Sequence, residues 1–591
     1  MRSAAYIGLI FIVVLSATLA FSGMPLQGDY SFTYSGPLSP VYSKEVPDAY
    51  LEFASVSRVG GVDYLLYYVR DGTVYTVYLV DLEQYQEHSR TLELGNVQNL
   101  YLGFLKSKIF LIYNIGTTLY MYTFSVPNLG LSANTQYSMG TSNYNYYILD
   151  DLNNDGEMEI LIETWMDQGT QIIQHTVTLS CFSGSDLSMI WTVSRSSQTS
   201  YMDNLKHVVE VGDFLPAGRI EILLAMNAIQ LTPLSMEIDY FLFSGMGNEV
   251  SHGIISNVIL GPSYEVLDID GDGVEEFADA GMYMTQDYQI HYKYVHFFFT
   301  SGPKMVELPG MGMFLSPAYV GVEMVYAQDV NGDGTADVPI TAYGEDATCL
   351  LLLNVQSQSI IYRRDFSSTS TMTTLVAYDA NDDSLFDILA FDTSSKILYM
   401  VDFRTGNDIW AYNIGAQNPG YELSYGVTYS LTTDYFILDL NGNGIPEFGI
   451  QKVSDKYTVD LMLIDAGGSF GVAQHFTDSV QEQIPGGQAG NFFTAPCGLD
   501  LYGQPGGDLY YVLQEQKSGG PHYYHIGLFT KGSSQPYESI GIYWAGSESI
   551  TPYLFPLASF GEKDIQFLGL GLFTTKSLYI FSSTGIPEIF F

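Results

Sequence analysis

Basic residues are scarce in this chain. Of its 591 residues, 22 are Lys or Arg and 65 are Asp or Glu, so the formal net charge is −43. A field of that sign repels phosphate backbones, which argues against nucleic acid as a partner, and it disfavours anionic lipid surfaces for the same reason. Divalent cations would instead offset part of the negative charge.

Cysteine is nearly absent. The three cysteines, Cys181, Cys349 and Cys497, are far apart in the sequence and odd in number. This pattern predicts no disulfide framework, and we interpret all three as small buried hydrophobic side chains. A single bridged pair is the alternative, and the sequence does not say which pair that would be.

Only one long apolar run occurs, and it lies at the N-terminus. Arg2 precedes an apolar stretch from residue 6 to about residue 21, and small residues such as Ala20 and Ser22 follow near its end. Residues 1–22 therefore read as an export signal cleaved near Ala20 to Ser22, and we expect a secreted or cell-surface protein. Retention of this run as an N-terminal anchor is the alternative, and no other membrane insertion is expected.

The sequence also lacks amphipathic helices longer than about two turns, where typical helices run about three. Short apolar or alternating runs, such as 62–69, 74–80, 109–113 and 119–124, alternate with turns of Gly, Asn, Asp and Ser. The 47 Tyr and 58 Gly fit many short strands and tight turns. We therefore expect an all-β fold.

Short acidic loops are the most distinctive feature that is present. The clearest is 268–276, which places Asp268, Asp270, Asp272 and Glu276 at positions 1, 3, 5 and 9. Alternate residues of an extended chain point the same way, so the first three carboxylates converge. Calcium prefers six to eight oxygen ligands, and a loop of this kind supplies most of them.

Related loops recur along the chain. Four further clear copies begin at Asp151, Asp329, Asp379 and Asp439, each after an apolar strand. Degenerate copies at 213–221 and 500–508 keep acidic residues at positions 1 and 9, and weaker ones lie at 55–63 and 556–564. First positions from 151 onward are spaced by 50 to 62 residues, a period typical of stacked or radial repeats.

Each repeat also carries a second hairpin between loops. Residues 178–193 resemble 398–414, and 240–254 and 351–366 look like worn versions. Four antiparallel strands per repeat predict the blade of a β-propeller. We expect about eight blades, up to ten, over 51–591, with the repeats clear from 148 to 565. One ring or two smaller ones remain alternatives, and the segment 23–50 is expected to complete the last blade near residues 30–42.

The loop sequences DLNNDGEME, DIDGDGVEE, DVNGDGTAD, DANDDSLFD and DLNGNGIPE resemble the calcium-binding FG-GAP or VCBS repeats of integrin α-subunit propellers. The FG and GAP words themselves are mostly missing, so the resemblance rests on the loops, their flanking strands and their period. It implies Ca²⁺ held by side chains at positions 1, 3, 5 and 9 and by the carbonyl of position 7. The implied ligands are Asp151, Asn153, Asp155, Glu157, Glu159, Asp268, Asp270, Asp272, Val274, Glu276, Asp329, Asn331, Asp333, Thr335, Asp337, Asp379, Asn381, Asp383, Leu385, Asp387, Asp439, Asn441, Asn443, Ile445 and Glu447.

Ligand charge predicts an order of affinity among these sites. The 268–276 loop has four carboxylates and should bind most tightly, whereas 439–447 has two and should bind most weakly. Ser384 replaces the usual Gly at position 6 of its loop, which predicts local strain. Acidic turns that hold water instead of metal are the alternative for any single loop. An EF-hand is excluded, because four of the five copies lack a carboxylate at position 12 and strands flank the loops.

In the degenerate loop 213–221, Arg219 occupies position 7, and two interpretations of it stand. It either serves as an internal cation between the remaining carboxylates or is a solvated strand residue.

No catalytic site is apparent. Nine His are scattered along the chain, and the closest pair, His522 and His525, would point to opposite faces of a strand. No GxSxG, HExxH or phosphate-binding loop is present. We expect a calcium-stabilised structural, adhesion or ligand-binding module whose partner is a protein or a surface polysaccharide. The alternative is a polysaccharide lyase-like enzyme on the same scaffold, which would need a base and a charge-neutralising group in one groove.

Overall fold

The computed structural model divides into two compact units. The first comprises Met1–Ile115, Leu119–Ser132 and Ile414–Phe591, and the second comprises Gly116–Thr118 and Ala133–Asn413. The residues that the structure describes are 30–34, 41–46, 48–170, 172–200, 206–215, 220–231, 234–256, 260, 264–269, 273–279, 282–284, 290–292, 294–299, 302–307, 313–314, 323–324, 328–343, 348–366, 372–381, 383–385, 387–392, 394–423, 447–452, 457–465, 471–494, 509–517, 521–529, 534, 538–544, 553–560, 565–574 and 577–582.

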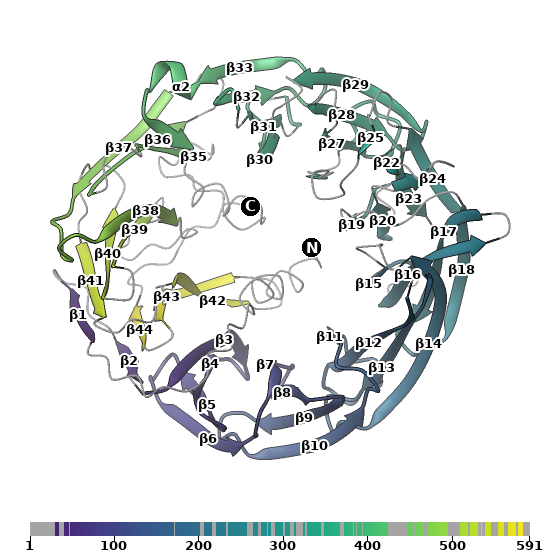
Figure 1. Ribbon diagram of the computed structural model, residues 1–591, viewed down its shortest axis with the longest axis horizontal. Coiled ribbons are helices and arrows are strands. Elements are labelled where there is room, and N and C mark those ends of the chain that lie inside the picture. The colour runs from purple at the N-terminus through teal and green to yellow at the C-terminus, as the bar shows by residue number, and fades with distance from the viewer. Residues whose placement is uncertain are drawn as a thin grey trace. The chain divides into compact units, whose positions relative to one another are not determined.

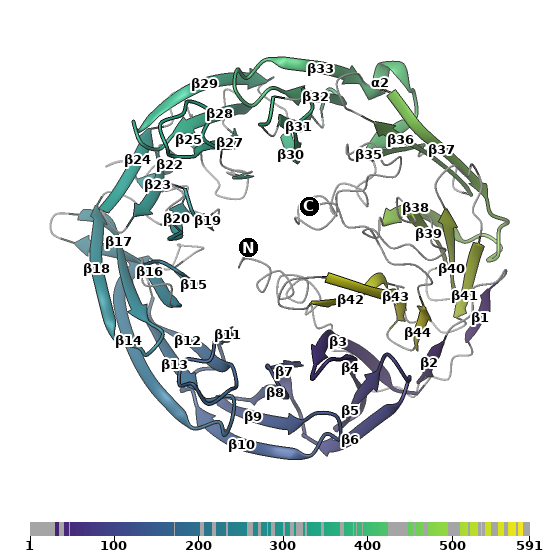
Figure 2. The ribbon, with the colours of Figure 1, turned by 180° about the vertical axis from the view of Figure 1, so that it is seen from behind.

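The second unit is built from antiparallel sheets whose strands follow one another in chain order. Four strands make up each of five sheets (β11–β14, β15–β18, β19-β20-β23-β24, β26–β29 and β30–β33), and β21, β22 and β25 form a smaller one. The chain order within a sheet can be followed for β15 to β18 in Figure 2. The strands are β11 Tyr144–Leu149, β12 Glu159–Gly169, β13 Ile172–Phe182, β14 Met189–Ser200, β15 His207–Gly212, β16 Glu221–Leu231, β17 Leu234–Ser244, β18 Glu249–Ser256, β19 Tyr264–Leu267, β20 Glu276–Asp279, β21 Met282–Met284, β22 Ile290–Tyr292, β23 Tyr294–Phe299, β24 Gly302–Glu307, β25 Met313–Phe314, β26 Glu323–Met324, β27 Asp337–Tyr343, β28 Thr348–Asn354, β29 Ser359–Phe366, β30 Met372–Tyr378, β31 Asp387–Asp392, β32 Ile397–Val401 and β33 Asp408–Asn413.

The first unit follows the same plan with strands from both ends of the chain. Its sheets are β3–β6, β34–β37, β38–β41 and β42–β44, and the β7–β10 sheet lies where the chain passes into the second unit. The one helix among the described residues, α2 (Ile414–Gln417), precedes β34. The strands are β3 Tyr50–Val59, β4 Val62–Asp71, β5 Val74–Asp81, β6 Glu87–Glu93, β7 Gln98–Phe104, β8 Lys108–Ile115, β9 Thr118–Ser125, β10 Leu131–Ser138, β34 Tyr421–Leu423, β35 Glu447–Lys452, β36 Thr458–Asp465, β37 Gly471–Ser479, β38 Gln488–Thr494, β39 Leu509–Gln516, β40 His522–Phe529, β41 Glu538–Trp544, β42 Tyr553–Phe560, β43 Ile565–Thr574 and β44 Ser577–Ser582.

Two N-terminal strands complete the C-terminal sheets of the first unit. Strand β2 (Tyr42–Glu45), which begins where the expected stretch 30–42 ends, pairs antiparallel with β44 and supplies the fourth strand of the last sheet. Strand β1 (Tyr30–Tyr34) instead pairs with β41 and becomes the fifth strand of the sheet before it, which corrects the expectation that the whole segment joins the last blade. Figure 1 shows β1 beside β41 and β2 beside β44. A free strand edge is a site of unwanted pairing, and these two strands cover such edges.

The predicted all-β class is confirmed, and the repeat unit is the four-stranded antiparallel blade of a β-propeller. The described residues form nine four-stranded sheets and one five-stranded sheet, which together reach the upper value of the expected blade number. The predicted runs 62–69, 74–80, 109–113 and 119–124 lie in β4, β5, β8 and β9. Among the described residues no helix is long and apolar enough to cross a membrane, and the expected signal segment 1–22 lies outside them.

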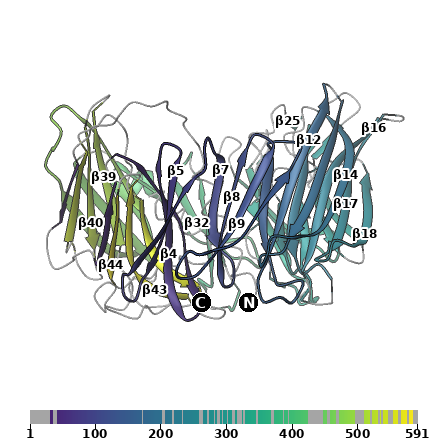
Figure 3. The ribbon, with the colours of Figure 1, turned by 90° about the horizontal axis from the view of Figure 1, so that it is seen from below.

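Burial explains why the inner strands read as nearly continuous apolar runs. In β4 and β8 six or more consecutive residues are buried, because both faces of an inner strand pack against neighbouring sheets. The last strands β6, β10 and β29 alternate between half-buried and exposed residues, the pattern of a strand with one covered face. In the side view of Figure 3 the long strands β12, β14, β16 and β17 of the second unit run alongside one another.

Apolar side chains join each sheet to the next. One cluster links β11–β14 to β15–β18 and includes Leu161, Val177, Ile222 and Phe243, all of which are fully buried. In the first unit, Leu65 and Tyr67 of β4 pack with residues of β44 such as Leu578, so the two ends of the chain share one core. Full burial of such a side chain contributes about 1.5–3 kcal/mol to stability.

The few basic side chains also join neighbouring sheets. Arg195 on β14 contacts the carboxylate of Glu249 at the start of β18, and its guanidinium lies over the ring of Phe243 at 5.2 Å. Arg364 on β29 contacts Asp408 at the start of β33 and lies over the ring of Tyr399 at 4.8 Å. In the first unit, Lys44 on β2 makes the same kind of contact with Glu87 of β6 (3.1 Å) and the ring of Tyr78 (4.1 Å). Each cation is thus held between a carboxylate and an aromatic ring of the next sheet.

Candidate metal centres in the acidic loops

Each acidic loop joins the first strand of a sheet to the second. The loop 151–159 lies between β11 and β12, 268–276 between β19 and β20, and 379–387 between β30 and β31. The loop 329–337 follows β26 and leads into β27, and 439–447 leads into β35. In the four loops whose ninth residue is described with its side chain, that carboxylate lies at the buried end of the loop, whereas the described residues at positions 3 and 4 of 151–159, 329–337 and 379–387 are exposed.

The first carboxylate of each described loop organises the backbone that follows it. In 151–159, the N–H groups of Asp155 and Gly156 donate to Asp151 at 3.0 and 2.9 Å. The same pair of bonds, from positions 5 and 6, reaches Asp329 at 3.1 and 2.9 Å and Asp379 at 3.0 and 2.8 Å. In 268–276 the bond from position 6 reaches Asp268 at 3.0 Å. The repeated sequence pattern therefore corresponds to one repeated loop conformation.

Position 6 of the loop needs a left-handed backbone. Gly156, Gly273 and Gly334 have φ of 94°, 83° and 85° there, values at which a Cβ is strained. Ser384 occupies this position with φ of 69°, so the strain predicted from the missing glycine is present in the backbone of this loop.

The ninth carboxylate closes the loop from the other end. One oxygen of Glu159 accepts the N–H of Leu152 at 2.6 Å, and the equivalent bonds reach Glu276 at 2.8 Å, Asp337 at 3.0 Å and Asp387 at 2.9 Å. These four carboxylates are almost completely removed from solvent, with at most 2% of the residue exposed. A buried carboxylate is costly unless its charge is compensated.

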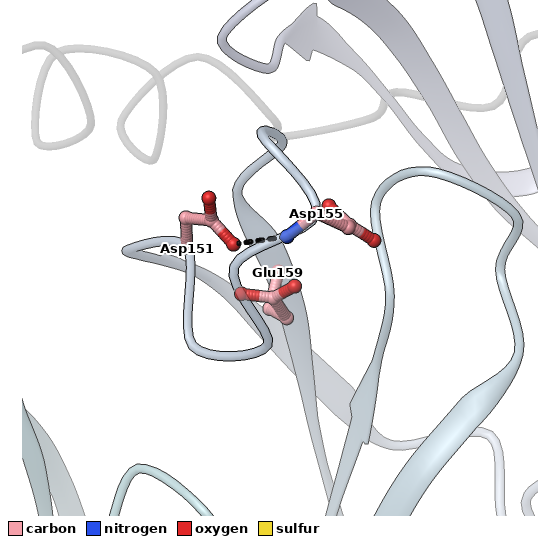
Figure 4. A group of neighbouring side chains, drawn as sticks. All are labelled: Asp151, Asp155 and Glu159. Carbon is pink, nitrogen blue, oxygen red and sulfur yellow. Dashed lines mark hydrogen bonds between the residues drawn. The ribbon is translucent and has the colours of Figure 1, made fainter.

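In the loop 151–159 three carboxylates converge. Asp151, Asp155 and Glu159 each place one oxygen within 4.8 Å of the others, and Figure 4 shows the three side chains around the turn. Glu159 Oε1 is buried and has no hydrogen-bond partner among the described residues. A cation that coordinates these three oxygens would supply the missing partner and the missing charge. The set of carboxylate and amide oxygens, with Asn153 at position 3, fits a hard cation such as Ca²⁺.

The electrostatics of the loop reflect the closeness of its carboxylates. Burial, followed by the carboxylates of Asp155, Asp151 and Asp150, raises the pKa of Glu159 to about 7. The pKa of Asp155 is held down at about 2, mainly by a hydrogen bond from Ser185 and then by others that include Ser183. Glu159 therefore resists ionisation, first because it is buried and then because the neighbouring carboxylates carry charge.

The loops 329–337 and 379–387 satisfy their ninth carboxylate differently. Asn354 Nδ2 donates to Asp337 Oδ1 at 2.8 Å and to Asp333 Oδ2 at 2.7 Å. In the other loop, the N–H of Phe403 donates to Asp387 Oδ1 at 3.1 Å. Burial again raises the pKa of both ninth carboxyls, to about 6 for Asp387. Within the described part of the chain, neither loop gathers three carboxylates as closely as 151–159 does.

The other predicted ligands are placed only in part. Asp268, Val274 and Glu276 are described, and Glu276 is buried next to Asp268's turn, but Asp270 and Asp272 lie outside the described residues. The predicted rank of 268–276 as the tightest site therefore stays a prediction. Of 439–447, only the backbone of Glu447 is described, and Asp439, Asn441, Asn443 and Ile445 lie outside, as does Arg219 of the degenerate loop. The remaining predicted ligands, Asn331, Thr335, Asn381, Asp383 and Leu385, lie at the expected places in their loops.

Two sets of residues near these loops were not anticipated from the sequence. Ser183 and Asn354 lie in the second hairpin of their sheets and bond the fifth carboxylate of the loop at 3.0 and 2.7 Å. Their common place at the C-terminal end of the third strand is the signal in the sequence that could have identified them. By contrast, His175 and His207 are far apart in the sequence and looked unrelated there. The packing of two neighbouring sheets brings His175 Nε2 to 2.8 Å from His207 Nδ1. No sequence signal pointed to that contact.

The cysteines follow the expectation where they are described. Cys181 and Cys349 are buried free thiols, and Cys497 lies outside the described residues.

No known protein family and no curated protein matches this sequence. Solved structures match it only distantly. The exotype rhamnogalacturonan lyase YesX is 12% identical with a TM-score of 0.31, over 83% of this chain and 90% of its own. The WD40 domain of SCAP from fission yeast is 10% identical with a TM-score of 0.29, over 94% and 98%. Porphyromonas gingivalis dipeptidyl peptidase 4 is 7% identical with a TM-score of 0.30, over 86% and 62%. Similarities at this level say nothing about activity, and the architecture rests on the strand pairing of the chain itself.

Proposed function

We propose that this protein is a secreted or cell-surface scaffold of propeller blades, stabilised by Ca²⁺, that binds a protein or a surface polysaccharide. The observation that carries the calcium part is the buried oxygen of Glu159, which lies beside the carboxylates of Asp151 and Asp155 and has no hydrogen-bond partner in the part of the chain that the structure describes. At the pH of most extracellular fluids, a cluster of this charge needs a cation to be stable.

Five residues of the loop 151–159 would supply the ligands of the ion. Asp151, Asp155 and Glu159 would hold the ion by carboxylate oxygens, Asn153 by its amide oxygen and Glu157 by its carbonyl. Bound Ca²⁺ supplies positive charge and coordination, and no chemistry beyond that. By joining positions 1, 5 and 9, it would fix the end of β11 against the start of β12.

The loops also connect neighbouring sheets of the second unit, which extends the effect of each site beyond its own hairpin. The N–H of Glu275 donates to the carbonyl of Asp213 at 2.8 Å, and the N–H of Ala336 donates to the carbonyl of Ile269 at 2.7 Å. In both cases position 8 of one acidic loop bonds the start of the loop before it. Ordering one loop therefore supports the next, and we assign the calcium sites a structural role.

A binding role is favoured over catalysis by the surroundings of the ionisable groups. A lyase needs a base and a charge-neutralising group that a polymer can reach. One cluster of His, Lys and carboxylate side chains in the described residues contains His175 and Glu163, whose side chains are at most 2% exposed, together with Asp167, whose side chain is 37% exposed. A carbohydrate chain cannot reach His175 and Glu163, which argues against these two groups as the base of a lyase.

Calcium titration of the full chain by calorimetry, together with thermal unfolding in Ca²⁺ and in chelator, tests the proposal. Binding at a hundredfold excess over the dissociation constant stabilises each site by about 2.7 kcal/mol. We expect a clear fall of the melting temperature in chelator. Asp151→Asn should remove one site from the stoichiometry and reduce the chelator effect.

Glu93→Gln is the control, because Glu93 is exposed at the end of β6 and lies outside the acidic loops. This variant should keep the stoichiometry of the natural protein. An identical melting curve in Ca²⁺ and in chelator would contradict the proposal. Binding of the partner would be screened with glycan arrays and surface extracts in both conditions. A partner that binds equally well without Ca²⁺ would show that Ca²⁺ stabilises the scaffold but is not needed for partner binding.

A further inference from the structure

A chain of ionisable side chains links two neighbouring sheets of the second unit, away from the acidic loops. Glu163 and Asp167 lie on β12 and His175 on β13, all in the β11–β14 sheet, whereas His207 lies on β15 in the next sheet. Glu163 is four residues beyond the last position of the acidic loop 151–159, so the group is separate from the candidate metal centre.

The four side chains are hydrogen-bonded in line. His175 Nδ1 lies 2.6 Å from Asp167 Oδ1, and His175 Nε2 lies 2.8 Å from His207 Nδ1. The other ring nitrogen of His207, Nε2, contacts Glu163 Oε1. The order along the line is therefore carboxylate, imidazole, imidazole, carboxylate, with the central bond crossing from one sheet to the other.

Three of the four side chains are largely shielded from solvent, whereas that of Asp167, at one end of the line, is 37% exposed. The side chain of His175 is fully buried, and those of Glu163 and His207 are 2% and 12% exposed. The Trp165 ring lies 5.5 Å from that of His207, measured between centroids. Hydrogen bonds at such a site are stronger than in water, and an imidazole nitrogen left without a proton or a donor is correspondingly costly.

The groups that face the line from the surrounding strands are as follows. Lys206, at the start of β15, donates to Asp167 Oδ2 at 2.6 Å. From β11, Tyr147 Oη and Asn145 Nδ2 donate to Glu163 Oε2 at 2.7 and 3.2 Å. From β14 and β16 the residues opposite the two histidines are the uncharged Ser197 and Met226. Lys206 is thus the one cationic side chain bonded to the line among the described residues, and it offsets the charge of Asp167.

Counting protons shows what this arrangement requires. Three hydrogen bonds in line need three protons, whichever atom carries each of them. Two neutral imidazoles supply two, and ionised carboxylates supply none. The line must therefore hold one proton more than two neutral histidines would. A fourth proton has no place in it, because both nitrogens at the His175–His207 contact would then carry hydrogen.

We propose that His175 and His207 share this additional proton between Asp167 and Glu163, and that the line acts as a pH-sensitive lock between the β11–β14 and β15–β18 sheets. The lock is closed when three protons are bound and opens when the third is lost or a fourth is added. Burial lowers the pKa of His175, with the neighbouring His207 acting in the same direction, which is consistent with resistance to the fourth proton.

The linkage has two limbs. In the unfolded chain each histidine titrates at about pH 6.5, so the pair holds two protons well above that pH and four well below it. The folded line holds three. Folding therefore takes up one proton on the alkaline side and releases one on the acid side. The contribution of this line to the folding equilibrium constant should therefore fall by up to tenfold for each pH unit above or below about pH 6.5.

Denaturant unfolding of the full chain between pH 5 and pH 8.5 tests the lock. The natural protein is compared with the double variant His175→Gln and His207→Gln. The difference between their unfolding free energies at each pH isolates the contribution of this site from that of all other groups. We expect the double variant to lose the bell-shaped component. The matched control is His252→Gln, since His252 lies on β18 of the same unit and stacks on Phe241 at 4.5 Å outside the line. This control should keep the profile.

Two further measurements hold even if the double variant does not fold. Glu163→Gln keeps an acceptor for His207 but removes the charge that holds the third proton, so the alkaline decline should begin at lower pH. In the natural protein, nitrogen-15 spectra of labelled histidine at pH 7 should show a proton on Nδ1 of His175 and on Nε2 of His207. The proposal would be overturned if the unfolding free energy of the double variant or of Glu163→Gln had the same pH dependence as that of the natural protein. It would also be overturned if the spectra showed two neutral rings with either Nδ1 of His175 or Nε2 of His207 unprotonated.

Discussion

Asn354 lies with its side-chain amide 2.8 Å from the buried carboxylate of Asp337, and the same Nδ2 atom reaches Asp333 at 2.7 Å. A neutral amide group thus lies between two carboxylates and donates to both. Asn354 comes from the end of β28, one strand away from the loop. The second hairpin of a blade therefore takes part in the acidic loop of the first.

Removing this amide should make the loop 329–337 depend more on metal. Asn354→Ala leaves the carboxylates of Asp333 and Asp337 without their shared donor, and we expect a loss of about 1–3 kcal/mol of unfolding free energy in chelator. The loss should be smaller in saturating Ca²⁺. Urea unfolding in both conditions measures it, with Ser251→Ala at an exposed position of β18 in the same unit as control. An equal loss with and without Ca²⁺ would show that Asn354 does not compensate for a metal.

The raised pKa of Glu159 leads to a second prediction. Its pKa of about 7 lies above the ordinary value of 4.5, so protonation stabilises the metal-free folded state, and this stability is lost as the pH rises toward 7. Glutamine imitates the protonated form. In chelator at pH 8, Glu159→Gln should therefore raise the unfolding free energy by up to about 3 kcal/mol, and the gain should vanish near pH 4.5.

In saturating Ca²⁺ the same substitution should have the opposite sign, because it removes a ligand. Unfolding of the natural protein and the variant at pH 8, with and without Ca²⁺, measures both effects. If Glu159→Gln lowered the unfolding free energy both with and without Ca²⁺, the charge of Glu159 would not be destabilising in the metal-free protein, contrary to the prediction.

The strained position in the loop 379–387 supports a third prediction. Ser384 has φ of 69°, where its three counterparts are glycine. A side chain in the left-handed region costs about 1–2 kcal/mol, and glycine returns about 0.5–1 kcal/mol of that as extra entropy of the unfolded chain. Ser384→Gly should thus raise stability by about 0.5–1 kcal/mol in thermal or urea unfolding. Gly156→Ala at the equivalent position should lower it, and a destabilising Ser384→Gly would refute the assignment of strain.

The cations between sheets yield a fourth prediction. Arg364 contacts Asp408 and lies over the rings of Phe366 and Tyr399 at 4.9 and 4.8 Å. We expect Arg364→Ala to lower the unfolding free energy by about 1–2 kcal/mol through lost cation–π contact and packing, with only a small change at high salt. Arg58→Ala, at an exposed position of β3, is the control and should change stability by less than about 0.5 kcal/mol. A loss that disappears at high salt would assign the effect to the ion pair alone.

The local features of this chain were predictable because they depend on residues close together in the sequence. The positions of Asp151, Asp155 and Glu159 in one nine-residue loop, and the strands on either side, follow from the pattern of Asp, Asn and Gly between apolar runs. The strain at Ser384 followed from a single missing glycine. The use of Asn354 and Ser183 could not be foreseen with the same reasoning, because these residues reach the loops only after the third strand has paired beside the second.

The sequence by itself determined the repeat of strand, acidic loop and hairpin, since hydrogen bonding and burial within a blade act over at most a few tens of residues. Only the tertiary structure decided which carboxylates meet and which are already compensated. Glu159 is left with an unpartnered oxygen, whereas Asp337 and Asp387 receive donors from the second hairpin. The same holds for His175 and His207, which are 32 residues apart and meet because two sheets pack face to face. Contacts between blades depend on packing geometry, and a pattern read along one strand carries no information about the strand it will face.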